Sequence, residues 1–142
     1  MTRPVTPQDV RRLTVAGVAA LVVLVAYWTL WFAARSTVAS DTTHAYYDFE
    51  NAFPAADAWL GICVVLALRG IRRGKRIGLF WLLAGGGAGV YLFAMDVLYD
   101  LEHGIYAKGA GGLIELAINV LTLGLSAWFL QWGYRWTALL AM

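Results

Sequence analysis

The sequence predicts an all-α integral membrane protein with four transmembrane helices in an up-down bundle and both termini in the cytoplasm. Three observations lead to this fold class. Hydrophobic residues make up 61% of the 142 residues and charged residues only 14%, against about 25% charged residues in an ordinary soluble domain. Four apolar runs are separated by short polar segments, and the basic residues are sorted to one side of these runs. We expect a single domain over residues 1–142.

The first predicted span, 13–34, has no charged residue until it ends and directly follows Arg11 and Arg12. Its 22 residues exceed the roughly 7–15 apolar residues of a signal peptide. They are also enough to cross about 30 Å of hydrocarbon. We therefore expect an uncleaved first transmembrane helix.

Each of the other three predicted spans carries one acidic residue near the same side of the membrane. The second span is the shortest, and Pro54 is placed for the first turn of its helix, where the missing N–H costs nothing. The third span follows a basic stretch, and the fourth ends next to Arg135. The spans and their acidic residues are 53–70 with Asp57, 77–99 with Asp96 and 113–134 with Glu115.

The basic residues predict the orientation, because segments rich in Lys and Arg stay in the cytoplasm. Only Arg35 and Lys108 of the 11 basic residues lie on the outer side. We expect the plasma (inner) membrane, with both termini and the second loop inside. Topology and anionic headgroups account for the inner charges, so the bilayer is the expected partner and no nucleic acid is expected. The inner basic residues are Arg3, Arg11, Arg12, Arg69, Arg72, Arg73, Lys75, Arg76 and Arg135.

The acidic residues are sorted in the opposite sense, and all except Asp9 lie outside or at outer membrane depth. Acidic residues contribute little to topology, so they need another explanation. A carboxylate that faces lipid costs about 3 kcal/mol near the bilayer centre and less near its surface. Asp57, Asp96 and Glu115 are therefore expected to point into the bundle and form an outward-facing cup.

Helical spacing extends this cup. Asp96, Asp100 and His103 stand at i, i+4 and i+7, on one face if the helix continues past Tyr99. A polar stripe on the fourth span has the same spacing and consists of Glu115, Asn119, Thr122 and Ser126. The predicted ligand-binding residues are Asp57, Asp96, Asp100, His103, Glu115 and Asn119.

The outer segment 44–51 adds further polar and aromatic residues. Its rings, including Tyr46 and Tyr47, favour an interfacial aromatic belt over a ligand cage. Two basic residues cannot neutralise eight carboxylates, so a proton, a divalent metal ion or a cationic ligand is the expected partner. Haem is not favoured, because no histidine pair lies buried at matching depth on two spans. The candidate metal ligands are His44, Asp48, Glu50, Asp100 and His103.

Small residues predict close packing in the third span. Gly85 and Gly89 stand four residues apart, a spacing that allows helices to approach closely. We expect this face to pack inside the chain or in a homo-oligomer. Cys63 is the only cysteine, so it forms no intramolecular disulfide and is expected in the core. Trp28 and other tryptophans are expected to anchor the helices at the interfaces.

Three functional classes follow, and the first is favoured. It is a protein whose outward-facing carboxylate cluster binds a cation or a protonated small molecule, with transport as an extension. The second is a membrane enzyme that uses Asp57, Asp96 or Glu115 for acid–base chemistry on a lipid or isoprenoid, as an isomerase or cyclase does. A cavity open to lipid beside Asp57 and Asp96 would favour this class. The third is an accessory subunit of a membrane complex. Motifs of hydrolases are absent.

Overall fold

The computed structural model describes residues 6–140 and, for side chains, residues 6–136. Within this part of the chain the structure is all-helical and has no strand. Arg3, one of the basic residues behind the predicted orientation, lies outside the described residues. The elements are α1 (Pro7–Ala33), η1 (Arg35–Thr37), α2 (His44–Glu50), α3 (Phe53–Arg72), α4 (Ile77–Glu102), η2 (Ile105–Ala107) and α5 (Gly109–Leu140).

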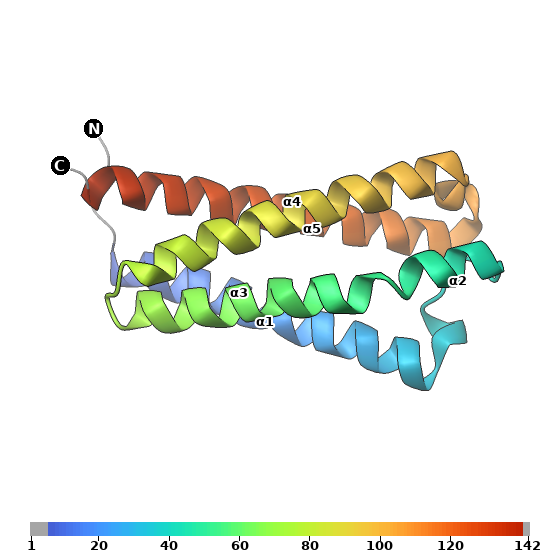
Figure 1. The fold of residues 1–142 in the computed structure, drawn as a ribbon, viewed down its shortest axis with the longest axis horizontal. Helices are drawn as coiled ribbons and strands as arrows, with labels where there is room; N and C mark the ends of the chain where they lie inside the picture. The colour runs from blue at the N-terminus through green and yellow to red at the C-terminus, as the bar shows by residue number, and fades with distance from the viewer. Residues whose placement is uncertain (1–5, 141–142) are drawn as a thin grey trace.

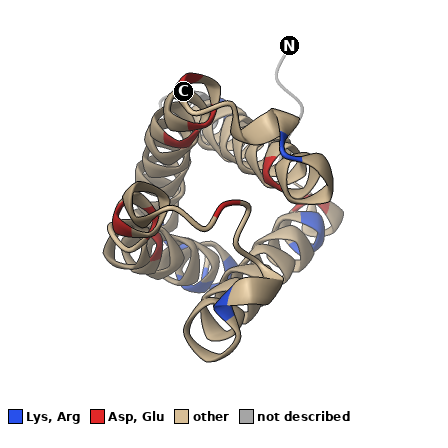
Figure 2. Ribbon diagram, turned by 90° about the vertical axis from the view of Figure 1, so that its right-hand side faces the viewer, with Lys and Arg blue, Asp and Glu red and all other residues tan. Residues whose placement is uncertain are grey.

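Four helical segments are long and apolar enough to cross a membrane, which confirms the predicted number of long helices. They are α1, α2 together with α3, α4, and α5 up to Trp136. The long helices run antiparallel from one to the next (Figure 1). We call the end that carries η1, α2 and η2 the acidic end, and the end with the α3–α4 turn the basic end. Viewed onto the acidic end, the long helices stand at the corners of a four-sided bundle (Figure 2).

The helices extend beyond the apolar runs because their polar flanks carry helix signals. α1 starts at Pro7 rather than at residue 13, since Thr6 and Asp9 form a capping box at its N-terminus. α4 continues to Glu102 rather than 99 and stops before Gly104. Gly104 has a φ of 61°, a left-handed conformation that glycine adopts without steric penalty.

The segment that the sequence analysis treated as an outer loop contains the short helix α2. The hydroxyl of Thr43 caps this helix by accepting from the backbone N–H of Tyr46. Only Asn51 and Ala52 separate α2 from α3. The indole N–H of Trp31 on α1 donates to the side-chain oxygen of Asn51 at 3.1 Å. This bond attaches the α2–α3 junction to α1.

The packing inside the bundle is uneven. α4 packs along α3 on one side and along α5 on the other, whereas α1 packs on α3 alone among the long helices. No Cα atom of α1 comes within 8 Å of one in α5 or α4 in the described residues. An apolar cluster around Leu13, Leu68, Leu82 and Phe129 fills the half of the bundle toward the basic end.

Gly85 and Gly89 of α4 serve packing within the chain. A Cβ atom on Gly85 would lie 3.1 Å from Cβ of Cys63 on α3, and one on Gly89 would lie 2.1 Å from Oγ of Ser126 on α5. Both glycines and Cys63 are buried. The predicted Gly85/Gly89 face is thus covered by the chain's own helices.

Candidate functional site

Three carboxylates from three helices meet inside the bundle, below the acidic end. Glu50 is the last residue of α2, Asp96 lies in the last two turns of α4, and Glu115 lies near the start of α5. One carboxylate oxygen from each residue lies within 4.8 Å of the other two. Glu50 and Glu115 are only 5% and 3% exposed, and Asp96 is half-buried. We call these three residues the carboxylate cluster.

Hydroxyl groups orient two members of the cluster. Glu115 accepts from Oγ of Ser40 at 3.3 Å and from the phenol of Tyr46 at 3.5 Å. Glu50 accepts from the phenol of Tyr27 at 3.4 Å. All three hydrogen bonds are long for O–H donors, whose usual distance is about 2.7–2.8 Å. They fix the direction of the side chains but provide the carboxyl groups with no ionic partner.

Neither cation at the acidic end reaches the cluster. Lys108 forms an ion pair with Asp41 in the connecting segments, and this bond lowers the pKa of the Asp41 carboxyl group. The guanidinium of Arg35 lies 4.9 Å from the ring centre of Trp31 and 5.0 Å from that of Tyr47. Among the residues with described side chains, no Lys, Arg or His makes a salt bridge to Glu50, Asp96 or Glu115.

A fourth acidic residue, Asp57, lies one turn into α3 and faces the same interior. Its carboxylate accepts a hydrogen bond of 2.9 Å from the indole N–H of Trp28 on α1. This bond is of normal length for N–H donors and satisfies one oxygen of a half-buried carboxylate. Trp28 therefore positions an acidic group in addition to contributing apolar surface.

A buried polar network adjoins the cluster on the side of η2. The amide of Asn119 donates to Asp100 at 3.1 Å and to the phenol oxygen of Tyr106 at 3.0 Å. Asp100 is 1% exposed, and its Oδ1 atom accepts no hydrogen bond. Burial and then the nearby charge of Asp100 raise the pKa of the Tyr106 phenol. Tyr106 is therefore a neutral hydroxyl group at physiological pH.

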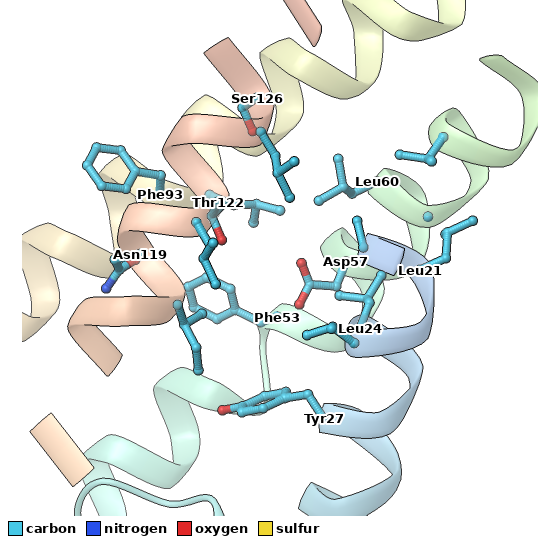
Figure 3. Close-up of a pocket in the computed structure, with 18 of the residues that line it drawn as sticks. Leu21, Leu24, Tyr27, Phe53, Asp57, Leu60, Phe93, Asn119, Thr122 and Ser126 are labelled. Atoms are coloured by element: carbon cyan, nitrogen blue, oxygen red, sulfur yellow. The ribbon is translucent and has the colours of Figure 1, made fainter. Parts of the chain in front are cut away.

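A cavity of about 400 Å³ leads from the cluster toward the middle of the bundle. Glu50, Asp57, Asp96 and Glu115 all line it, together with Asn119, Thr122 and Ser126 of the predicted polar stripe. Asp57 and Thr122 extend into it from opposite walls (Figure 3). Most other lining residues are apolar, and they include Leu24, Phe53, Leu60, Leu92, Phe93 and Phe129. The cavity is thus acidic at one end and apolar along its length.

The cavity is closed at both ends of the bundle and open on one side. α2 and the segment before it cover the cluster, since Tyr46 is fully buried and Ser40 donates to the backbone of Gly111 on α5 at 3.2 Å. The apolar cluster closes the basic end. Between α1 and α5, however, Val23 and Leu121 line the cavity and remain 64% and 62% exposed. The cup expected to open outward is therefore covered, and its cavity opens sideways.

The structure places the predicted site residues in three groups. Asp57, Asp96, Glu115 and Asn119 line the cavity, and Asp100 lies behind them in the buried network. Of the candidate metal ligands, only Glu50 joins a group of three that could hold a metal ion in the described residues. His44, Asp48 and His103 are exposed on the surface of the acidic end. His103 follows the last turn of α4 and stacks on the ring of Tyr99, so it does not share the environment of Asp96.

The residues that hold the carboxylates are not predicted by the sequence. Nothing in the sequence singles out Tyr27, while its pattern favours an aromatic belt for Tyr46 and an interfacial anchor for Trp28. Ser40 had no role. A signal for Trp28 was present, because a donor on one span and an acid on the next stood at similar depth. No comparable signal existed for Ser40, which reaches Glu115 only through the path of the α1–α2 connection.

Comparison with protein-family models, curated proteins and solved structures gave no match to this chain. The chemistry of the site therefore follows from its geometry. Oxygen atoms 4.8 Å apart or less can share a cation at about 2.4 Å, the usual Ca²⁺–oxygen distance. They can equally accept three charge-assisted N–H bonds of about 2.8 Å from one ammonium group. The cluster is thus spaced for a single cationic group.

Proposed function

We propose that the protein binds an organic amine in its central cavity, with the ammonium group at Glu50, Asp96 and Glu115 and the apolar part of the molecule along the cavity. The single observation that carries this proposal is the joining of the carboxylate cluster to an apolar cavity of about 400 Å³. This volume falls in the range of about 300–1,000 Å³ that is usual for small-molecule sites.

The number of acceptors favours an amine over a metal ion. A primary ammonium group has three N–H donors, and the cluster offers three carboxylates from three different helices. A Ca²⁺ ion takes six to eight oxygen ligands, whereas the walls beyond the cluster are mostly apolar. A metal ion would also leave the apolar length of the cavity without an occupant.

The proposal includes a membrane setting. We propose that the four apolar helices cross the plasma membrane, with the basic end in the cytoplasm, as the distribution of Lys and Arg indicates. The cluster then lies within the membrane near its outer surface. Charged groups at such depth mark ligand sites in many membrane proteins. Binding rather than transport is favoured, because the apolar cluster around Leu13 and Phe129 leaves no open path toward the basic end.

The binding test uses purified protein in lipid nanodiscs and follows tryptophan fluorescence during thermal unfolding. The probe is octylamine, with octanol as the neutral control and MgCl₂ and CaCl₂ as inorganic cations. At one hundred times its dissociation constant, a ligand of the folded state adds about 2.7 kcal/mol to the free energy of unfolding. We expect octylamine, and none of the controls, to raise the midpoint of unfolding.

Two variants make this test specific. Asp96→Asn removes one charge from the cluster and should abolish most of the octylamine effect. Asp48→Asn removes a charge from the exposed surface of α2 and should leave the effect unchanged. Helical content by circular dichroism should match in all proteins. A shift with Ca²⁺ or Mg²⁺ alone would replace the amine by a metal ion, and equal shifts in both variants would refute the site.

A second candidate function is acid–base catalysis on a lipid or isoprenoid. The cavity passes directly beside Asp57 and Asp96 and opens sideways between α1 and α5, as access for such a substrate requires. One carboxyl group would supply a proton to the substrate and a second carboxylate would remove one from a different carbon. Isomerisation of an isoprenoid alcohol that Asp57→Asn abolishes would establish this function.

A further inference from the structure

We infer that the amine is a lipid-soluble one, with a long alkyl chain, that enters the cavity from the bilayer through the gap between α1 and α5. This inference rests on the proposed function and specifies both its ligand class and the route of entry. Seven small or apolar residues frame the gap, which we call the side opening. They are Ala16, Ala19, Ala20 and Val23 on α1, and Ile118, Leu121 and Leu125 on α5.

Access along the bundle axis is blocked at the acidic end. Tyr46 is fully buried over the cluster, and Glu50 and Glu115 are at most 5% exposed. Ser40 bonds both to Glu115 and to the backbone of Gly111. These bonds join the α1–α2 connection to the start of α5. A ligand in water at this end therefore has no direct access to the carboxylates.

The side opening is a gap between two helices that do not pack on each other. The Cα atoms of α1 and α5 stay more than 8 Å apart throughout the described residues. The residues of α1 that frame the gap follow at i, i+3, i+4 and i+7, so they form one face of the helix. Three of these four are alanines. Val23 and Leu121 line the cavity and are also more than 60% exposed.

The two ends of the cavity differ in chemistry, and this difference restricts the occupant. The frame of the side opening is apolar and uncharged, so it suits an alkyl chain in contact with lipid. The inner end of the same cavity has three carboxylates and no ionic partner among the described side chains. Only a molecule with both a cationic head and an apolar chain complements the two ends. A neutral lipid would leave the charges unpaired, and an anionic lipid would be repelled.

The experiment uses proteoliposomes of phosphatidylcholine that contain the protein and 9,10-dibromo-octadecylamine, whose bromine atoms quench tryptophan fluorescence on contact. The matched lipids are the dibrominated alcohol of the same length and unbrominated octadecylamine as competitor. We expect quenching by the amine at low mole fraction, reversal by the competitor, and weaker quenching by the alcohol that the competitor does not reverse.

The side opening is tested by narrowing it. The variant Ala19→Phe/Val23→Phe/Leu121→Phe adds rings at exposed positions of the frame. The control variant Val18→Phe/Val22→Phe/Val120→Phe changes the residue directly before each of these. The control residues are between 48% and 62% exposed and do not line the cavity. We expect the first variant to need at least a tenfold higher mole fraction of amine for half-maximal quenching, and the control to behave as the parent.

The outcomes separate the two proposals. If the parent shows no quenching that the amine competitor reverses, both the proposed function and lateral entry fail. If the parent shows it and the two triple variants do not differ, amine binding stands and lateral entry is refuted. A second copy of the chain is the alternative occupant of the side opening. The test is an Ala19→Cys/Cys63→Ala protein in amine-free bilayers. If it forms disulfide-linked dimers whose tryptophans resist quenching by the brominated amine, the inference is also overturned.

Discussion

The indole N–H of Trp28 on α1 donates to the carboxylate of Asp57 on α3 at a distance of 2.9 Å. This bond joins α1 to α3, the one long helix on which α1 packs in the described residues, and it does so beside the cavity. Hydrogen bonds between membrane helices contribute about 0.6 kcal/mol on average and up to about 1.7 kcal/mol. The bond therefore serves stability and also fixes the direction of an acidic group.

The first prediction concerns this pair. In a double-mutant cycle of Trp28→Phe and Asp57→Leu, we expect a coupling free energy of about 1 kcal/mol between the two side chains. The measurement is reversible unfolding of the purified protein in mixed micelles, followed by circular dichroism. Trp59→Phe is the control, because Trp59 is 50% exposed on the same helix as Asp57. Strictly additive effects of Trp28→Phe and Asp57→Leu would contradict the prediction.

The second prediction concerns the cover of the carboxylate cluster. The phenol of Tyr46 donates to Glu115 and accepts from the backbone N–H of Ser40. Tyr46→Phe removes the hydroxyl group and leaves both partners without their hydrogen bond to it, which lowers the free energy of unfolding by about 1–3 kcal/mol. We expect faster amide exchange over residues 44–50 as well as lower stability. Tyr47→Phe retains the ring under Arg35 and should leave the exchange unchanged.

The third prediction concerns the turn between α3 and α4. A Cβ atom on Gly78 would lie 2.5 Å from the backbone nitrogen of Ile71, so Gly78→Ala forces the two helices apart. We expect a loss of about 1–3 kcal/mol. Gly87 is on the same helix and has open space around it. Gly87→Ala should raise stability by about 0.5–1 kcal/mol, and a similar loss in both variants would disprove the packing argument.

The fourth prediction concerns the pH dependence of stability that arises from the ion pair of Lys108 and Asp41, which lies outside the apolar helices. Lys108 lowers the pKa of Asp41 in the folded protein, so the unfolded chain binds more protons at acidic pH. The pair therefore adds stability above the pKa of the unfolded chain, about 3.9, and this contribution disappears as the pH falls through the folded pKa. Because the pair is solvent-accessible, the effect on stability is small.

The measurement for this pair is the carboxyl carbon resonance of Asp41 by NMR in micelles. We expect Lys108→Met to raise the pKa of Asp41 toward its ordinary value. Lys75→Met, in the turn at the opposite end of the bundle, is the matched control and should not change it. An unchanged Asp41 titration in Lys108→Met would show that the ion pair does not persist in solution.

Much of the fold follows from local signals in the sequence. The four long helices coincide with apolar runs, because backbone groups in such runs are best satisfied within a helix. The meeting of Asp96 and Glu115 follows from depth and helix direction alone. The position of α2 is different, since it depends on how the α1–α2 connection folds back over the bundle. For this reason the sequence indicates Glu50 as a candidate metal ligand but not as a neighbour of Asp96.

The direction in which the site opens could not be read from the sequence either. A helix with apolar residues all round gives no indication of which faces meet another helix and which meet lipid. Ala19 and Ala26 look alike in the sequence, yet only Ala19 lines the cavity. The distinction comes from the way α1 packs on α3, which it meets at Gly17 beside Val64 and Leu68.

The attachment of α1 along a single face has a consequence for selectivity. Since α4 packs on both α3 and α5, while α1 packs on α3 alone among the described long helices, an outward tilt of α1 would widen the cavity and leave the contacts of α4 in place. Alkyl chains of different width would then fit in the cavity at a modest energetic cost. The cluster is held from three separate directions by α2, α4 and α5, so it has no such freedom. On the proposed function, the site is thus strict about the head of an amine and tolerant of its tail.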